Sequence, residues 1–489
     1  MKKTLMTILV SGLMFASCSK QETTDNPLLQ KWDTPFETAP FEKIKVEHYL
    51  PAFEAAMEEH NKEIQAIIDN AEAPTFDNTI AALDYAGETL SKVAGVFFNM
   101  MAANTSEELQ KVNEQVGPMM ATHSDNISMN AKLFEKIKAV YDAKDSQKYT
   151  GEQLALLEKT YNKFVRSGAL LDAAKQEELR KVNAELTKVE AKFDANLLKE
   201  TKAYQLVVEN EEDLKGLPQG EIEKAAALAK EKGQEGKWIF TLDNPSFMPF
   251  VTYADNRDLR KEIFNARVNR CNNGGETDNN ALVAQMSELR AKKAQLLGYE
   301  TFAHYQLEER MAKEPKAVFD LLENLLSYSV KVAKEEATQF QAMLSKDVPG
   351  ATLEAWDMYY YAEKVRQQKY NFDAELTRPY FEINNVRQGC FDVLTKLYGI
   401  SFTERKDVSV YAEDVLAFEA KNEKGEHVGI LYWDPYTRAS KGSGAWCNEY
   451  RGQSRKDGKN ITPIITVCFN YAKSPNGATT LTADEALTV

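Results

Sequence analysis

The sequence lacks any unbroken apolar run of the roughly 18 residues that a membrane-spanning helix needs. It also has only five cysteines in 489 residues. Cys271, Cys390, Cys447 and Cys468 are widely spaced, and they match neither a CxxC metal pattern nor a dense disulfide framework. Buried free thiols are therefore expected, with a pairing of Cys447 and Cys468 across a sheet as the alternative.

Positive charge is in deficit, because 60 basic residues face 74 acidic ones and the net charge is −14. No Lys/Arg cluster is interleaved with aromatic residues. Such a chain repels phosphate backbones, so nucleic acid is not an expected partner. With 43% hydrophobic residues, the chain is long enough to bury a large core.

The first 17 residues have the pattern of a secretory signal peptide. Two lysines precede the apolar run Leu5–Val10, which is too short to span a bilayer. Phe15-Ala16-Ser17-Cys18 is similar to a bacterial lipobox, which implies acylation of Cys18 and a membrane anchor. An ordinary cleavage site beside a cysteine is the alternative. The lipobox implies an exported lipoprotein of the bacterial cell envelope, in the periplasm or at the outer membrane.

Residues 18–30 are polar and without hydrophobic periodicity, and they are predicted to form a flexible tether between lipid and folded body. Folding is expected to begin near Trp32. Two domains follow in this prediction, an N-terminal helical domain over residues 31–240 and a second domain over residues 241–489.

Helical periodicity dominates the first half of the chain. Apolar residues recur at steps of three and four at Leu179, Val182, Leu186, Val189, Phe193 and Leu197. Asp172 is placed to cap the start of this helix. The same spacing at Phe53, Met57, His60, Ile64 and Ile67 puts His60 on an apolar stripe, which favours a packed histidine over a metal ligand. The same interpretation applies to His48, His123 and His304.

Strand patterns are fewer and shorter. Residues 205–208 and 237–242 flank a predicted helix at 221–232 and indicate a small structural insertion. Residues 415–418 and 428–433 flank a turn at 423–426, which predicts a β-hairpin with His427 facing solvent, and residues 464–469 predict a further strand. The expected fold is mainly α-helical with a small β-sheet.

Several separated motifs stand out in the second half of the chain. They are Gly298-Tyr299 through Arg310-Met311-Ala312, Trp356–Tyr361, Arg366, Asp373, Pro379–Glu382, Ser443–Trp446, and Pro463-Ile464 through Asn470-Tyr471. Together they resemble the thimet oligopeptidase and peptidyl-dipeptidase family of zinc metallopeptidases. Their order and spacing match from about Pro35 to the last residue. The resemblance implies an enzyme that hydrolyses short peptides and, in the dipeptidyl carboxypeptidase branch, releases C-terminal dipeptides.

Zinc chemistry in that family needs a helical His-Glu-x-x-His, because residues four apart share a helix face. The five histidines, at 48, 60, 123, 304 and 427, include no such pair. The resemblance places the first zinc ligand about two residues after Val489. Thr482 and Glu485 form a capping-box pattern that starts a helix without a stop signal. We therefore expect residues 241–489 to form an incomplete metallopeptidase catalytic domain that lacks its zinc-binding part. The chain is expected to hold no zinc and to be inactive alone. A natural frayed terminus is the alternative.

Residues that bind the substrate are, by contrast, expected within this chain. The resemblance places Gly444, Ala445 and Trp446 on an edge strand along the cleft, where unpaired amides can bind an extended peptide. The alternative is an ordinary edge strand with Trp446 in the core. Two further hypotheses for the whole chain are a non-catalytic peptide-binding lipoprotein and a helical scaffold without a peptide role.

Overall fold

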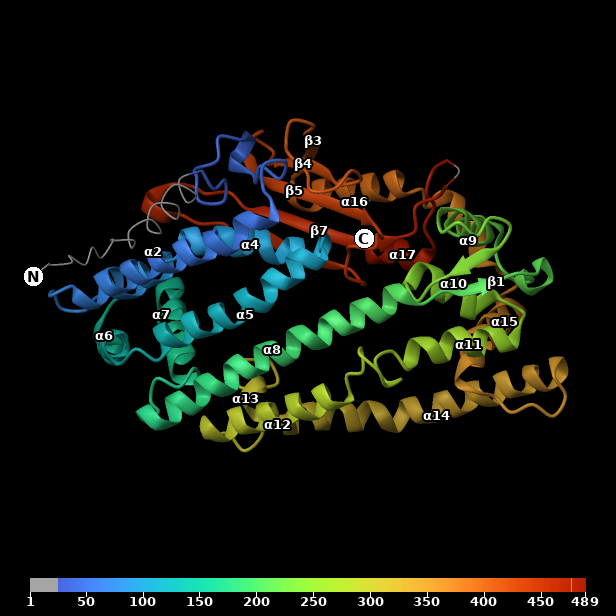
Figure 1. The fold of residues 1–489 in the computed structure, drawn as a ribbon, viewed down its shortest axis with the longest axis horizontal. Coiled ribbons are helices and arrows are strands. Elements are labelled where there is room, and N and C mark those ends of the chain that lie inside the picture. The colour runs from blue at the N-terminus through green and yellow to red at the C-terminus, as the bar shows by residue number, and fades with distance from the viewer. Residues whose placement is uncertain (1–24, 476) are drawn as a thin grey trace, which may run out of the picture.

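The computed structural model describes residues 25–475 and 477–489, and most of them are helical (Figure 1). This confirms the predicted mainly α-helical fold. The α-helices are α2 (Tyr49–Asp69), α3 (Ala82–Tyr85), α4 (Glu88–Ala103), α5 (Glu107–Ser128), α6 (Ala131–Asp142), α7 (Gly151–Arg166), α8 (Ala173–Ala203), α9 (Gln219–Glu231), α10 (Asn244–Tyr253), α11 (Arg257–Val268), α12 (Asn280–Leu296), α13 (Phe302–Leu307), α14 (Pro315–Asp347), α15 (Met358–Tyr370), α16 (Ile383–Tyr398) and α17 (Ala483–Thr488). Cys18 and the predicted signal peptide lie outside the described residues.

Helix α8 runs through the middle of the elongated molecule (Figure 1). Asp172 caps the helix by accepting a hydrogen bond from the Lys175 amide, as predicted. Its apolar stripe is buried from Leu179 to Val189, between α5 and α12. The predicted stripe on α2 is confirmed as well, with Phe53 fully buried.

A two-stranded sheet lies at one end of the molecule. Strands β1 (Leu206–Val208) and β2 (Trp238–Phe240) pair antiparallel, and α9 lies between them in sequence. This confirms the two predicted strands and the predicted helix between them. The hydrophobic cluster beneath it extends from Leu206 to Ile263, across the predicted domain boundary at residue 240.

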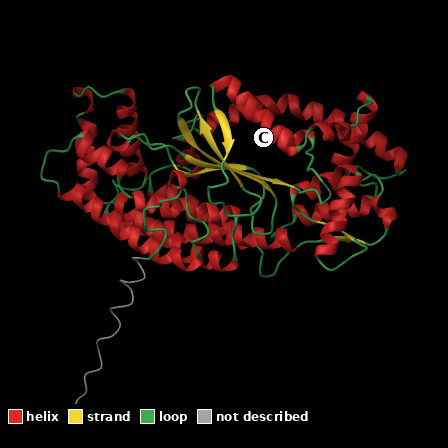
Figure 2. Cartoon of the chain, turned by 90° about the horizontal axis from the view of Figure 1, so that it is seen from above, coloured by secondary structure: helices red, strands yellow, loops and turns green. Residues whose placement is uncertain are grey.

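The main sheet has five strands near the centre, with helices on both sides (Figure 2). The strands are β3 (Ser401–Glu404), β4 (Leu416–Lys421), β5 (His427–Tyr436), β6 (Trp446–Arg451) and β7 (Ile464–Tyr471). Their spatial order is β3-β4-β5-β7-β6, so β6 is an edge strand. Strands β4 and β5 form the predicted hairpin, whereas β7 pairs parallel with β5 and antiparallel with β6.

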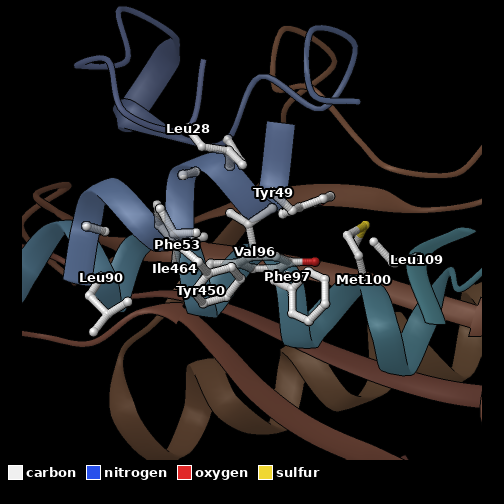
Figure 3. Close-up of a cluster of buried hydrophobic side chains, with 14 of the residues drawn as sticks. Leu28, Tyr49, Phe53, Leu90, Val96, Phe97, Met100, Leu109, Tyr450 and Ile464 are labelled. Carbon is white, nitrogen blue, oxygen red and sulfur yellow. The ribbon is translucent and has the colours of Figure 1, made fainter. Parts of the chain in front are cut away.

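One hydrophobic core joins the beginning of the chain to this sheet (Figure 3). Phe97 of α4 is fully buried in the cluster that also contains Tyr450 and Ile464. Leu28 is fully buried there too, and Asn26 is 3% exposed. The predicted tether over residues 18–30 is therefore wrong at its end, because an apolar side chain at position 28 fills the core.

Across residues 25–475 and 477–489, no helix combines the length and the apolar composition needed to cross a membrane. The cysteines among these residues are free, as expected. Cys271 and Cys468 are buried, whereas Cys447 is exposed on β6. The alternative pairing of Cys447 with Cys468 is wrong, because Cys468 lies opposite Trp446 and Cys447 lies opposite Val467, on the other face of the sheet.

Candidate functional site

A cleft of about 620 Å³ separates the end of the main sheet from the helices around α10 and α15. Its sheet side is lined by Gly444, Ala445, Phe469, Asn470 and Tyr471. Its other sides are lined by Glu221, Asn244, Pro245, Met248, Pro249, Thr252, Tyr253, Glu363, Arg366, Phe372, Glu375, Thr377, Arg378 and residues 482–485 and 488. The walls thus come from segments far apart in sequence.

The three residues predicted to bind substrate are placed differently. Gly444 and Ala445 are exposed and line the cleft, while Trp446 begins β6 and is half-buried outside the lining. Gly444 has φ +97°, a conformation that glycine adopts without strain. The following residues 447–449 are exposed on the edge strand. An extended peptide could therefore pair with β6 beside Ala445, as strand addition requires.

The accessible edge of β6 is short, because α4 packs against its far end. The Asn99 side chain donates a hydrogen bond to the carbonyl of Glu449 at 2.9 Å. Gly95 lies so close to β6 that a Cβ there would approach the Tyr450 carbonyl to 3.0 Å. The part of the β6 edge outside these contacts with α4 runs from Trp446 to Asn448.

Two arginines in the cleft wall are already paired with carboxylates. Arg366 binds both oxygens of Glu363 at 2.7 Å. Arg378 contacts Glu221 at 2.9 Å and Glu375 at 2.8 Å. Burial raises the pKa of Glu375, although Arg378 opposes the shift. These ion pairs shape the wall and leave neither guanidinium as an isolated positive charge.

The sequence did not indicate the Glu221–Arg378 pair, because its members are 157 residues apart. Each looks like an ordinary charged residue in its local segment. By contrast, the capping box at the start of α17 is confirmed. The Glu485 amide donates to Thr482 Oγ1 at 3.1 Å, and the Thr482 amide donates to Glu485 Oε2 at 2.8 Å. This short helix closes one end of the cleft.

The histidines do not gather into a metal site. His123 Nε2 lies 2.9 Å from His60 Nδ1, so these two rings hydrogen-bond to each other between α2 and α5. Burial lowers the pKa of both. Within the described ranges, no group of three or more His, Cys, Asp or Glu residues could hold a metal ion. The donor set of these residues therefore does not fit the tetrahedral zinc site of a metallopeptidase.

The prediction that His427 faces solvent is wrong. Its ring stacks on Phe36 with centroids 4.6 Å apart. Its two nitrogens lie 3.2 Å from Glu419 Oε1 and 3.1 Å from Thr462 Oγ1. The hairpin turn looks exposed in the sequence, but the N-terminal segment and the residues before β7 cover this side chain.

Comparison with known proteins points to one family of peptidases. Residues 250–489 match the model of "Peptidase family M3". Over 456 residues the chain is 35% identical to a dipeptidyl carboxypeptidase of Escherichia coli strain K12, covering 93% of this chain and 67% of that protein. Over 473 residues it is 32% identical to oligopeptidase A of the same organism, covering 95% and 68%. An organellar oligopeptidase A of Arabidopsis thaliana is 30% identical over 447 residues, covering 89% and 56%.

Proposed function

The chain belongs to peptidase family M3, and we propose that its 489 residues form the peptide-binding part of an enzyme that hydrolyses short peptides. The observation that carries this proposal is the cleft beside the open edge of β6, with Gly444 and Ala445 in its wall. The chain spans about two thirds of the length of the bacterial relatives that it matches. The peptide hydrolysis that a whole family member performs is therefore proposed for the protein to which this chain belongs.

The proposed reaction is release of dipeptides from the C-terminus of short peptides. Support comes from the relative named dipeptidyl carboxypeptidase, which is 35% identical. Oligopeptidase A, at 32%, favours a broader reaction on the same class of substrate. Analysis of the products formed by a complete family member that includes these residues distinguishes the two.

We further propose that the metal of the reaction is zinc and that these 489 residues alone neither hold it nor hydrolyse peptides. The sequence contains no His-Glu-x-x-His, and the histidines at 60 and 123 satisfy each other. Family hydrolysis needs imidazole ligands in one helical motif. The contribution of this chain is to bind and orient an extended peptide.

The proposed location is the bacterial cell envelope, with a lipid on Cys18 as the membrane anchor. The support is the segment Phe15-Ala16-Ser17-Cys18 after an apolar run. A Cys18→Ser variant is expected to leave the membrane fraction. If Cys18 carries no lipid in mass spectrometry, the anchor is excluded.

A peptide-binding lipoprotein without catalysis is the second candidate. It is favoured by the coexistence of a formed cleft with a donor set that does not fit zinc. Peptide binding without turnover is expected under both candidates. They differ in whether a complete family member containing these residues cleaves the same peptides.

The test measures binding and hydrolysis of a fluorescent hexapeptide by the purified chain, with added Zn²⁺ and with a chelator. Binding without turnover is expected. Turnover that the chelator abolishes contradicts the proposed inactivity, and absence of binding contradicts the peptide-binding role.

A matched pair of variants locates the binding. Ala445→Trp fills the cleft and is expected to weaken binding strongly, because Ala445 lines it. Ala71→Trp makes the same change at an exposed position after α2 and is expected to have no effect. Equal affinities in the two variants exclude the cleft as the binding site.

A further inference from the structure

The loop that joins β5 to β6, residues 437–445, contains a fully buried lysine. Lys441 is 0% exposed, and so is Asp434 near the end of β5. Lys441 Nζ lies 2.9 Å from Asp434 Oδ1. It also donates to the backbone carbonyls of Asp434 at 2.9 Å and Tyr436 at 3.0 Å. Three acceptors thus match the three protons of the ammonium group.

The carboxylate of Asp434 has further partners. Arg438 donates to both of its oxygens at 2.8 Å, and the Tyr411 hydroxyl donates to Oδ2 at 2.8 Å. Burial favours the neutral acid, but the hydrogen bonds from Arg438 and the charge of Lys441 outweigh it and lower the pKa of Asp434. Asp434 is therefore an ionised centre to which the loop is attached.

Helix α4 holds the other side of the same loop. The Gly442 amide donates to the carbonyl of Ala102 at 2.9 Å, and the Thr105 amide donates to the carbonyl of Ser440 at 2.8 Å. Arg438 also donates to the carbonyl of Ala103. The end of α4 and the end of β5 thus fix the loop from two directions.

The third attachment is Asn470 of β7, which lies in the cleft wall. Its Nδ2 donates to the carbonyl of Gly442 at 2.8 Å and to the carbonyl of Gly444 at 2.7 Å. One amide group therefore fixes two carbonyls of the segment that enters the cleft. The path of the backbone up to Ala445 is set before any peptide arrives.

Stability alone is a weak explanation for this arrangement. Removing two charges from water is costly, and buried ion pairs can often be replaced by apolar residues without loss of stability. A loop held at several of its backbone groups is, however, preorganised, and preorganisation lowers the entropic cost of binding. We infer that the buried Asp434–Lys441 pair is a positioning device that holds residues 442–446 in the conformation that pairs with an extended peptide. This inference rests on the proposed peptide binding.

The variant that tests the inference is Lys441→Met, which keeps an unbranched side chain and removes the ammonium group. Asp434 retains Arg438 and Tyr411, so its carboxylate is not left alone. Faster amide hydrogen exchange is expected in residues 439–446, with β4 and the N-terminal half of β5 unchanged. Peptide affinity is expected to fall about tenfold, the cost of ordering one or two loop residues on binding.

A second peptide separates positioning from a general structural effect. In the wild-type chain, N-methylation of the peptide backbone is expected to remove the proposed hydrogen bonds to β6 and to weaken binding. In Lys441→Met this penalty is expected to disappear, because the loop no longer presents its backbone groups in register. Lys473→Met removes the exposed partner of Asp414, and it is expected to keep the wild-type exchange, affinity and penalty.

If Lys441→Met does not fold, Lys441→Gln gives the same test, since it removes the charge of the same buried pair and keeps a polar group at that position. Faster loop exchange together with loss of the N-methyl penalty supports the inference. Unchanged exchange, or faster exchange with unchanged affinity and penalty, overturns it. A wild-type chain that binds no peptide overturns the proposed function, and the inference with it, before any variant is compared.

Discussion

Helices α8 and α14 are the two longest helices of the described residues, with 31 and 33 residues, yet their apolar faces have different surroundings. In α8, Leu179 is fully buried and Val182 is 3% exposed. In α14, Leu322 is 52% exposed and Leu326 is 59% exposed. Ion pairs follow the same division, since Arg290 and Lys292 of α12 reach across to α8, whereas Lys316 of α14 pairs within its own helix.

The comparison of α8 with α14 shows that an apolar helix face and a buried helix face are two different properties. A repeat of three and four predicts a helix and tells which face is apolar. It does not tell whether another element covers that face. Helix α8 packs between α5 and α12, while α14 packs mainly against α15 through Phe340 and Leu344 near its end. Large exposed apolar patches mark binding or aggregation surfaces.

The largest expected effect compares truncations on the two helices. Leu179→Ala opens a cavity and is expected to lower the free energy of unfolding by about 2–5 kcal/mol. Leu322→Ala removes an exposed side chain and is expected to change it by less than about 0.5 kcal/mol. Urea unfolding followed by circular dichroism measures both. A large cost for Leu322→Ala contradicts the comparison, because it requires a cover over α14.

A pH series sharpens the comparison at the interface of α5 and α8. Asp125 of α5 accepts hydrogen bonds from Asn183 of α8, and burial raises its pKa above the ordinary 3.8. The folded state thus favours the protonated acid. This contribution is complete below pH 3.8 and is lost as the pH rises through the raised value. Asp125→Asn is therefore expected to be more stable than the wild type at pH 8.

The advantage of Asp125→Asn is expected to shrink as the pH falls, since the wild-type carboxyl then takes up a proton. The new amide can also donate to Asn183 Oδ1, which has no hydrogen-bond partner. Asp320→Asn, at an exposed position of α14, is the control, and it should change the stability by less than about 0.5 kcal/mol. Thermal unfolding between pH 4 and pH 8 is the measurement. A destabilised Asp125→Asn at pH 8 contradicts the sign.

The helix starts also differ. Asp172 caps α8 with its side chain, whereas Glu314 at the start of α14 makes no capping hydrogen bond. Asp172→Ala is expected to cost about 1 kcal/mol, and Glu314→Ala nearly nothing. Equal costs in chemical denaturation would show that the cap does not distinguish the two helices.

The smallest effect concerns the ion pair between Arg290 and Glu190, which links α12 to α8 at 2.7 Å. Both side chains are about two-fifths exposed, so solvent screens the pair. A double-mutant cycle is expected to give a coupling of about 0.2–1 kcal/mol that decreases with added salt. A coupling that salt does not change is inconsistent with a solvent-screened pair.

The sequence was sufficient where the signal is local. Capping by Asp172, the box of Thr482 and Glu485, and the β4–β5 hairpin each depend on residues a few positions apart. The sequence alone did not predict contacts between distant segments, such as the ion pair of Glu221 and Arg378. Lys441 shows the same limit in another form, because it lies only seven positions after Asp434, but the fold alone makes both inaccessible to water.

The predicted binding residues show both outcomes. The family resemblance placed all three residues along the cleft, and of these Gly444 and Ala445 line it, whereas Trp446 does not. Whether Trp446 faces cleft or core depends on its neighbours in the sheet. Lys441 Nζ lies over the Trp446 ring, 5.9 Å from its centroid. That neighbour comes from the loop path, which the sequence does not reveal.

Amide hydrogen exchange of the 489-residue chain with and without a saturating hexapeptide tests the central claim most directly. Peptide pairing with the open edge is expected to slow exchange in residues 446–448 of β6 and to leave α14 unchanged. Protection confined to the exposed apolar face of α14, with β6 unaffected, would contradict the account.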